Sequence, residues 1–269
     1  MIENNVAILL STYNPNYELF VNQLKSIFNQ DYKNIKLFIR DDGSSKSKLK
    51  KIEDLIKVSN FEVSLIKGEN VGSKLSFIYL LNQVNYFDYY MFCDQDDFWY
   101  PNKVSKFLNT ILTIKSSKPS LVFGNMKVTN HKNIVISESF WNYQKINLNV
   151  IGNISSLIAH NPITACSCIF NNSAKKLLID NRFDLQHDHL LGILIIFNKG
   201  ILMPLHDITM NYIQHSSNQL GAIKLKNSLG SLRSLLLSQK KILMIGRSLN
   251  VSFFSIMYKK IQINLKRII

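Results

Sequence analysis

An acidic motif follows an apolar run in the first half of the chain. The run YYMFC ends at Cys93, and Asp94, Asp96 and Asp97 come directly after it, with Gln95 between the first two. Carboxylates at i and i+2 after a buried strand project toward one side, and hard oxygen ligands at this spacing suit magnesium or manganese shared with a diphosphate. Carboxylates this close repel one another, so a cation is also a physical need. A DxD motif alone is a weak signal, but three aspartates after an apolar strand are a stronger one.

Polar residues also follow three earlier apolar runs. They are Thr12, Tyr13 and Asn14 after the first run, Asp41 and Asp42 after the second, and Asn70 and Gly72 after the third. Open parallel sheets bind their ligands at the carboxyl ends of the strands. Any one of these loops is equally consistent with a solvated surface, but the four together predict a single binding site.

The periodicity of apolar residues predicts the elements that position this site. Strands at 6–11, 35–40, 61–66 and 89–93 alternate with segments in which apolar residues recur at helical spacing. The first helix is expected to begin at Asn14 and Pro15, a capping residue and a proline at the first helical position. The alternation predicts an α/β fold, with a mostly parallel central sheet of Rossmann-like character and flanking helices.

The second half of the chain has a less regular pattern. We expect a helix at 101–114, strands at 121–128, 165–170 and 210–215, and helices at 171–178 and within 185–197. Leu229, Leu232 and Leu236 recur at helical spacing in the segment from residue 222 onward. These patterns predict two parts: an α/β domain over 1–221 and a basic amphipathic helical tail over 222–269.

The composition excludes a disordered chain, because hydrophobic residues make up 46% and charged residues only 19%. The net charge of +14 predicts an anionic partner. Ten basic residues and no acidic ones follow Asp207, so most of this charge belongs to the tail. A basic groove for nucleic acid across the fold is therefore not indicated.

Cys93, Cys166 and Cys168 cannot all pair, which fits a reducing compartment. Without a second Cys or His pair at zinc spacing, Cys166 and Cys168 are expected to be small core residues. No signal peptide and no long apolar span is read from the sequence. We expect a cytoplasmic chain, peripheral at the inner face of the plasma membrane.

The chain resembles a known family in its motifs. VAILLSTYNPNYELF, LFIRDDGSS, ENVG and YYMFCDQDDFWYPNKV are similar to the family 2 inverting glycosyltransferases with the GT-A fold. The similarity is strong over roughly residues 5 to 105 and looser to about 221, the expected catalytic domain. The later segments NPITACSCIFN, HDHLL and YIQHSSNQLG resemble the rhamnosyltransferase-like branch, which builds bacterial surface polysaccharides.

The resemblance implies roles for the residues of the first half. Thr12 and Tyr13 match positions that contact the nucleotide base, and Asp42 matches the acid that hydrogen-bonds the base or ribose. Asp94 matches the ribose-side aspartate of the DxD motif, and Asp96 matches its metal ligand, for Mn²⁺ or Mg²⁺. We expect Asp97 to be a helper for the donor sugar or for metal-bound water.

Two residues of the second half complete the expected site. Inverting transfer needs a base that takes the proton of the acceptor hydroxyl, and Asp188 in His187-Asp188-His189 is the candidate. A helix N-cap is the alternative role for Asp188. His215 matches a position that can complete the metal or diphosphate shell in related enzymes, although a lone histidine is often structural.

The resemblance implies a metal-dependent transfer of sugar from a nucleoside diphosphate, dTDP-rhamnose or a UDP-hexose, to a hydroxyl of a lipid-linked or growing glycan. Alternatives are a non-catalytic glycan-binding or scaffold member of the same fold, and a nucleotidyltransferase. The basic tail is expected to attach to an anionic membrane surface, or else to pack on the catalytic domain or on a second subunit of a homo-oligomer.

Overall fold

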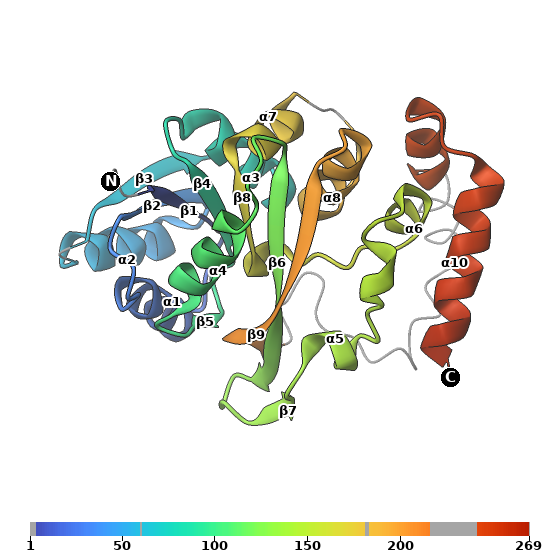
Figure 1. Cartoon of the computed structure of the whole chain (residues 1–269). Coiled ribbons are helices and arrows are strands. Elements are labelled where there is room, and N and C mark those ends of the chain that lie inside the picture. The colour runs from blue at the N-terminus through green and yellow to red at the C-terminus, as the bar shows by residue number, and fades with distance from the viewer. Residues whose placement is uncertain (1–3, 60, 181–182, 216–240, 269) are drawn as a thin grey trace.

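The first half of the chain has the predicted alternation of strands and helices. A computed structural model describes residues 4–59, 61–180, 183–215 and 241–268, and Figure 1 shows the chain. The elements are β1 (Val6–Thr12), α1 (Tyr17–Phe28), β2 (Ile35–Asp42), α2 (Lys46–Lys57), β3 (Val63–Gly68), α3 (Ser73–Gln83) and β4 (Tyr89–Cys93).

The second half contains longer strands and several short helices. Its elements are β5 (Phe98–Trp99), α4 (Lys103–Leu112), β6 (Ser120–Asn130), β7 (Val135–Ser137), α5 (Phe140–Tyr143), the 3₁₀ helices η1 (Leu148–Val150) and η2 (Ala165–Ser167), α6 (Ile154–Ala159), β8 (Cys168–Asn171), α7 (Asn172–Ile179), α8 (His187–Phe197), β9 (Ile201–Gln214) and α10 (Phe253–Ile268).

The strands form one mixed, mostly parallel sheet in the order β3-β2-β1-β4-β8-β6-β9-β5, with β7 paired to β6. The pairs β3–β2, β2–β1, β1–β4 and β6–β9 are parallel. Strand β8 runs antiparallel to both of its neighbours, β4 and β6. The predicted α/β fold with a mostly parallel sheet is thus confirmed. The order also brings the ends of β1, β2 and β4 to the same edge.

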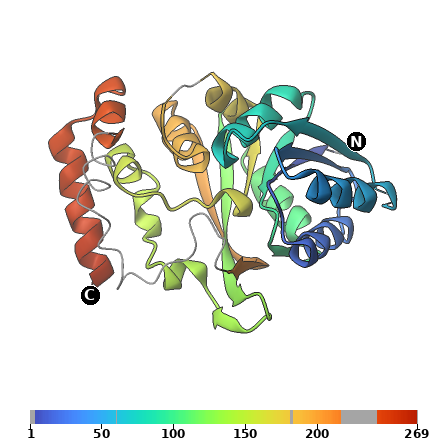
Figure 2. The same ribbon diagram turned by 180° about the vertical axis from the view of Figure 1, so that it is seen from behind.

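Helices cover both faces of the sheet. Helices α3, α7 and α8 contact one another on one face, and α4 packs against β6, β8 and β9 on the other (Figures 1 and 2). Residues 6–10 of β1 have no exposed surface. A parallel strand covered on both faces reads as an unbroken apolar run, which is why this strand was evident in the sequence.

Three predicted boundaries differ from the structure. Helix α1 is capped by Asn16, whose side chain accepts the amides of Glu18 and Leu19, while Asn14 has a positive φ of 43°. The predicted strand at 165–170 begins as η2 and becomes extended only at Cys168. Strand β9 begins at Ile201, well before the predicted 210.

The early part of β9 was missed because Pro204 interrupts its pattern. Proline cannot donate to a ladder and is confined to edges and bulges. Strand β9 pairs with β5 only at Met210 and Asn211, so its outer side is an edge at Pro204. The proline is therefore accommodated within a long strand.

The described part of the basic tail packs on the rest of the chain. Residues 241–248 are helical, and α10 lies alongside α6 (Figure 1). Ile256 of α10 has no exposed surface, and the Ser255 hydroxyl donates to that of Ser155 across 2.8 Å. The leucines at 229–236 lie outside the described residues. Among the described helices, none combines the length and the apolarity needed to cross a bilayer.

A buried histidine makes the fold sensitive to acid. His187 is 5% exposed between the rings of Phe77 and Phe92, and neither ring nitrogen has a hydrogen-bond partner within the described part of the chain. Burial lowers its pKa to about 3, from about 6.5 in an unfolded chain. Below pH 6.5 the His187 side chain therefore binds a proton in the unfolded state but not in the folded state. The free energy of unfolding falls as the pH is lowered, until the pH reaches about 3.

We expect His187→Leu to remove this dependence. Between pH 7 and pH 4.5 the free energy of unfolding should fall by about 2–3 kcal/mol more in the wild type than in the variant. Urea unfolding at the two pH values measures the difference. Equal dependence of stability on pH in His187→Leu and in the wild type would contradict the account.

Candidate functional site

The acidic motif begins where β4 ends, next to the end of β1. Gln95, inside the motif, joins the two loops: its Oε1 accepts the Thr12 hydroxyl and the Tyr13 amide, both at 2.9 Å. Thr12 is buried, whereas Tyr13 is half-exposed and leaves its ring open to a ligand. The structure thus brings Thr12 and Tyr13 against the motif through Gln95, a residue for which the sequence indicated no role.

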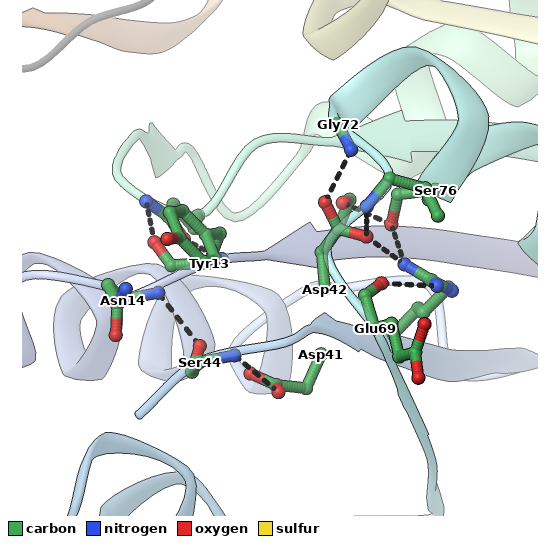
Figure 3. A network of polar contacts seen from close by, with 12 residues as sticks. Tyr13, Asn14, Asp41, Asp42, Ser44, Glu69, Gly72 and Ser76 are labelled. Carbon is green, nitrogen blue, oxygen red and sulfur yellow. Dashed lines mark hydrogen bonds and ion pairs between the residues drawn. The ribbon is translucent and has the colours of Figure 1, made fainter. Parts of the chain in front are cut away.

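The two aspartates that end β2 point to opposite sides of the strand (Figure 3). The Asp42 carboxylate accepts the amides of Val71 and Gly72 at 3.0 and 2.9 Å and forms a buried ion pair with Arg40. Arg40 also donates to the Ser76 hydroxyl at 3.0 Å. Asp42 therefore holds the loop before α3 in place.

Asp41 is oriented toward the other loops. Its Oδ2 accepts the Ser44 amide at 2.9 Å, and Oδ1 is buried without a hydrogen-bond partner in the described part of the chain. The Ser44 hydroxyl in turn accepts the Asn14 amide at 2.8 Å. A side chain at Gly43, where φ is +82°, would place its Cβ 2.7 Å from the Asn70 nitrogen, so only glycine lets these loops meet.

Two aspartates of the acidic motif lie close to a cysteine. Ligand atoms of Asp94, Asp97 and Cys166 all lie within 4.8 Å of one another. Asp97 is 1% exposed, accepts the Ile213 amide at 3.2 Å through Oδ1, and leaves Oδ2 without a partner among the described residues. Burial and then the charge of Asp96 raise the pKa of Asp94 to about 7, and the same two causes, in the same order, raise that of Asp97.

These carboxylates fit a divalent cation. Two close carboxylates, one with an orphaned buried oxygen, are oxygen donors of the kind that magnesium and manganese prefer. Their raised pKa values reflect burial and then repulsion between neighbouring carboxylates, and a bound cation would offset both effects. The Cys166 thiol suits these ions poorly, and burial raises its pKa well above the usual range, so it remains neutral.

A buried lysine lies next to the acidic motif. Lys103, at the start of α4, has no exposed surface, and its ammonium donates to the Cys166 carbonyl at 2.6 Å and lies 4.1 Å from the centroid of the Trp99 ring. Burial lowers its pKa to about 8. The lysine places a fixed positive charge near Asp97 that the sequence, in which it resembles a surface lysine, did not reveal.

The end of β9 returns to the motif. Nε2 of His215 lies 2.8 Å from Oδ2 of Asp96, and both side chains are largely buried. The two predicted metal-binding residues are thus in direct contact, but Asp96 is not one of the three residues whose ligand atoms converge. In the sequence, Asp96 lies between Asp94 and Asp97.

Asp188 lies in the first turn of α8. The N-cap position is occupied by Gln186, whose side chain makes no capping hydrogen bond, so Asp188 is not the N-cap residue. Asp188 is half-buried, its Oδ1 accepts the His189 amide at 2.7 Å, and it also accepts the Ala165 amide and the Asn161 side chain. Burial outweighs these hydrogen bonds and raises its pKa to about 6.

The short helix η2 connects Asp188 with the motif. The backbone of Ala165 hydrogen-bonds to Asp188, and the side chain of the next residue, Cys166, hydrogen-bonds to Asp94. The charge of Asp188 is close enough to contribute to the raised pKa of Asp94. The sequence indicated Asp188 and the motif separately, but not the segment that joins them.

Comparisons with solved structures show the same fold. A mannosyltransferase, PcManGT from Pyrobaculum calidifontis in complex with GDP-Man and Mn²⁺, aligns with a TM-score of 0.60 at 14% identity, over 81% of this chain and 59% of that one. S. aureus TarS 1-349 in complex with UDP-GlcNAc aligns with a TM-score of 0.59 at 17% identity, over 89% and 66% of the two chains. The chain therefore spans about three fifths to two thirds of these proteins.

A search of curated protein sequences gave no match. The family model described as glycosyl transferase family 2 matches residues 7–166, more than half of the chain. This range runs from β1 to η2 and includes Thr12, Asp42 and the whole acidic motif, whereas Asp188 and His215 lie beyond it. The chain therefore belongs to glycosyl transferase family 2.

Proposed function

We propose that the protein transfers a sugar from a nucleoside diphosphate to an acceptor hydroxyl. The observation that carries the proposal is the meeting of the β1, β2 and β4 ends at a buried group of carboxylates suited to a divalent cation. Membership of the family supports it, and so do the GDP-Man and UDP-GlcNAc complexes of the two structures with the same fold.

The nucleotide is proposed to lie over the ends of β1 and β2. Tyr13 offers an exposed ring for stacking, and Thr12 is held beside it by Gln95. Asp42 is proposed to act on the base or ribose side, while it fixes the loop at Gly72. Asp94, at the end of β4, is then placed on the ribose side of the diphosphate.

A divalent cation, Mn²⁺ or Mg²⁺, would neutralise the charge of the leaving diphosphate when bound. Asp96 is proposed as its principal ligand, with His215 in contact with the same carboxylate. Asp97 is proposed to orient the donor sugar or a metal-bound water, and its Oδ2, which has no hydrogen-bond partner among the described residues, supports this role.

Asp188 is proposed as the base of an inverting transfer. Its carboxylate would take the proton of the acceptor hydroxyl as that oxygen attacks the anomeric carbon. A base must be ionised at the working pH and still hold the proton well. A pKa of about 6 meets both requirements near neutral pH.

We further propose dTDP-rhamnose or a UDP-hexose as donor and a lipid-linked or growing glycan as acceptor, in bacterial surface polysaccharide synthesis at the cytoplasmic side of the membrane. The support is the resemblance of NPITACSCIFN, HDHLL and YIQHSSNQLG to the rhamnosyltransferase-like branch. The first two segments contain η2 and the start of α8. The hydrogen bond between Ala165 and Asp188 joins these two elements.

The proposal is tested by incubating the purified protein with UDP-, dTDP- and GDP-sugars and manganese, and by identifying the nucleotide released. Nucleoside diphosphate supports sugar transfer, whereas pyrophosphate would indicate a nucleotidyltransferase. Glycan binding without turnover of any donor would indicate a non-catalytic member of the fold.

The pH dependence of the rate is a further expected result. Because Asp188 must be ionised to act, kcat/KM should fall about tenfold per pH unit below a pH of about 6. Initial rates with saturating manganese between pH 4.5 and 8 measure the profile, and a rate that stays level through pH 5 would exclude Asp188 as the base.

A further inference from the structure

Helix α10 carries an exposed apolar stripe. The stripe consists of Phe254, Tyr258, Ile261 and Leu265, whose side chains are 82%, 60%, 55% and 57% exposed. Spacings of four, three and four residues place them on one face of the helix. Single exposed apolar residues are ordinary on protein surfaces, but a continuous row over three turns marks an interaction surface.

The stripe is not the face that holds α10 on the protein. That face carries Ile256 and Ile263, which are 0% and 5% exposed, and the Ser255 hydroxyl bonded to Ser155. By helical geometry Ile256 and Ile263 lie on the side of α10 opposite the stripe. Figures 1 and 2 both show α10 at the outer margin of the described structure, so the stripe faces away from it.

The segment that carries the stripe has charge of one sign. Lys259 and Lys260 follow Tyr258 directly, and by the same geometry they lie half-buried on either side of the packed face. No acidic residue occurs anywhere in the sequence after Asp207, and ten basic residues do. The occupant of the stripe must therefore accept aliphatic and aromatic side chains and also carry negative charge.

The need for both an apolar surface and negative charge distinguishes between three kinds of partner. A second copy of the chain would bring the same cationic tail against this one, and the like charges would repel. A nucleic acid offers the negative charge but no apolar surface against which Ile261 and Leu265 could pack. An anionic lipid surface offers both, because it takes up an exposed apolar helix face at its interface and attracts a segment that carries only basic charge.

We propose that the stripe on α10 docks the protein on an anionic lipid surface. The apolar side chains enter the boundary between headgroups and acyl chains, and the anionic headgroups attract the net positive charge of the tail. Because the opposite face of α10 is packed on α6, docking fixes the orientation of the catalytic domain to the membrane. The proposal is independent of the donor and of the chemistry of transfer.

Sedimentation with vesicles tests the proposal. The full chain is mixed with phosphatidylglycerol or with phosphatidylcholine vesicles at low and high salt. We expect binding to the anionic vesicles only, weakened by salt, and a reduction of roughly tenfold or more in the variant Phe254→Ser/Ile261→Ser, since two large apolar side chains leave the lipid. The matched control Val58→Ser/Ile134→Ser removes residues that are 80% and 60% exposed elsewhere, and should bind as the wild type does.

Two further readouts separate this proposal from others. Donor hydrolysis in solution should be equal in the wild type and both double variants, so an inactive enzyme that still binds vesicles would contradict the proposed function alone. Equal vesicle binding by Phe254→Ser/Ile261→Ser and the wild type would overturn the lipid proposal. So would a wild-type dimer in light scattering that the same variant dissociates, because the stripe would then bind a second copy.

Discussion

Replacement of Asp188 by asparagine is expected to lower kcat by about 10²–10⁴-fold, the range for the loss of a positioned base. The affinity for nucleotide should remain nearly unchanged, because Asp188 is proposed to act on the acceptor and lies in α8, outside the loops at Thr12 and Asp42. Asparagine keeps the shape of the side chain and its capacity to accept the His189 amide, so the start of α8 should be preserved. Steady-state kinetics and calorimetry with nucleoside diphosphate measure the two quantities.

The matched control is Asp54→Asn on the surface of α2. Asp54 pairs with Lys50 one helical turn away, and both side chains are more than half exposed. Surface pairs of this kind contribute little, so its turnover should equal that of the wild type. Retention of most of the turnover by Asp188→Asn would exclude the residue as the base.

Replacement of Asp96 by alanine is expected to have the opposite pattern of effects. Loss of the proposed ligand should abolish the response of turnover to manganese and weaken nucleotide binding in manganese by about 10–100-fold. In the presence of a chelator, variant and wild type should bind nucleotide equally weakly. Titration calorimetry with and without manganese measures this.

His215→Ala is the informative companion of Asp96→Ala, since the two side chains are in contact at 2.8 Å. If both act on the same ion, the double variant should be no worse than Asp96→Ala alone, because residues that act as a unit are not additive. A reversed pattern, with Asp188→Asn losing nucleotide and Asp96→Ala losing only rate, would show that the two roles have been exchanged.

The first half of the fold could be predicted because its central strands, β1 and β4, are buried on both faces. An uninterrupted run such as residues 6–10 or 89–93 is bounded by polar loops, and the helices between such runs keep one apolar face. The second half offered weaker signals. Helices α5 and α6 have four and six residues, too few for a periodic pattern, and Pro204 concealed the first part of β9.

The acids at 41–42 and 94–97 could be predicted because they end or follow strands, whereas Asp188 lies in a helix and was indicated by the resemblance. The residues that position them could not, because their roles arise from contacts distant in the sequence. Lys103 reads as a surface lysine in a helix, and is buried only because η2 and β9 fold over it at Cys166 and Met210. Gln95 acts through Thr12 and Arg40 acts through Asp42, so neither has a signature of its own.

The most direct test of the central claim is a crystal structure of the protein soaked with manganese and a nucleotide sugar that it turns over. We predict an anomalous manganese peak against the carboxylates of the acidic motif, the base beside Thr12 and Tyr13, and the anomeric carbon facing Asp188. A nucleotide bound elsewhere, for example in the 220 Å³ cavity between Arg40 and Tyr79 at the β3 edge, or a diphosphate without metal at the motif, would contradict the account.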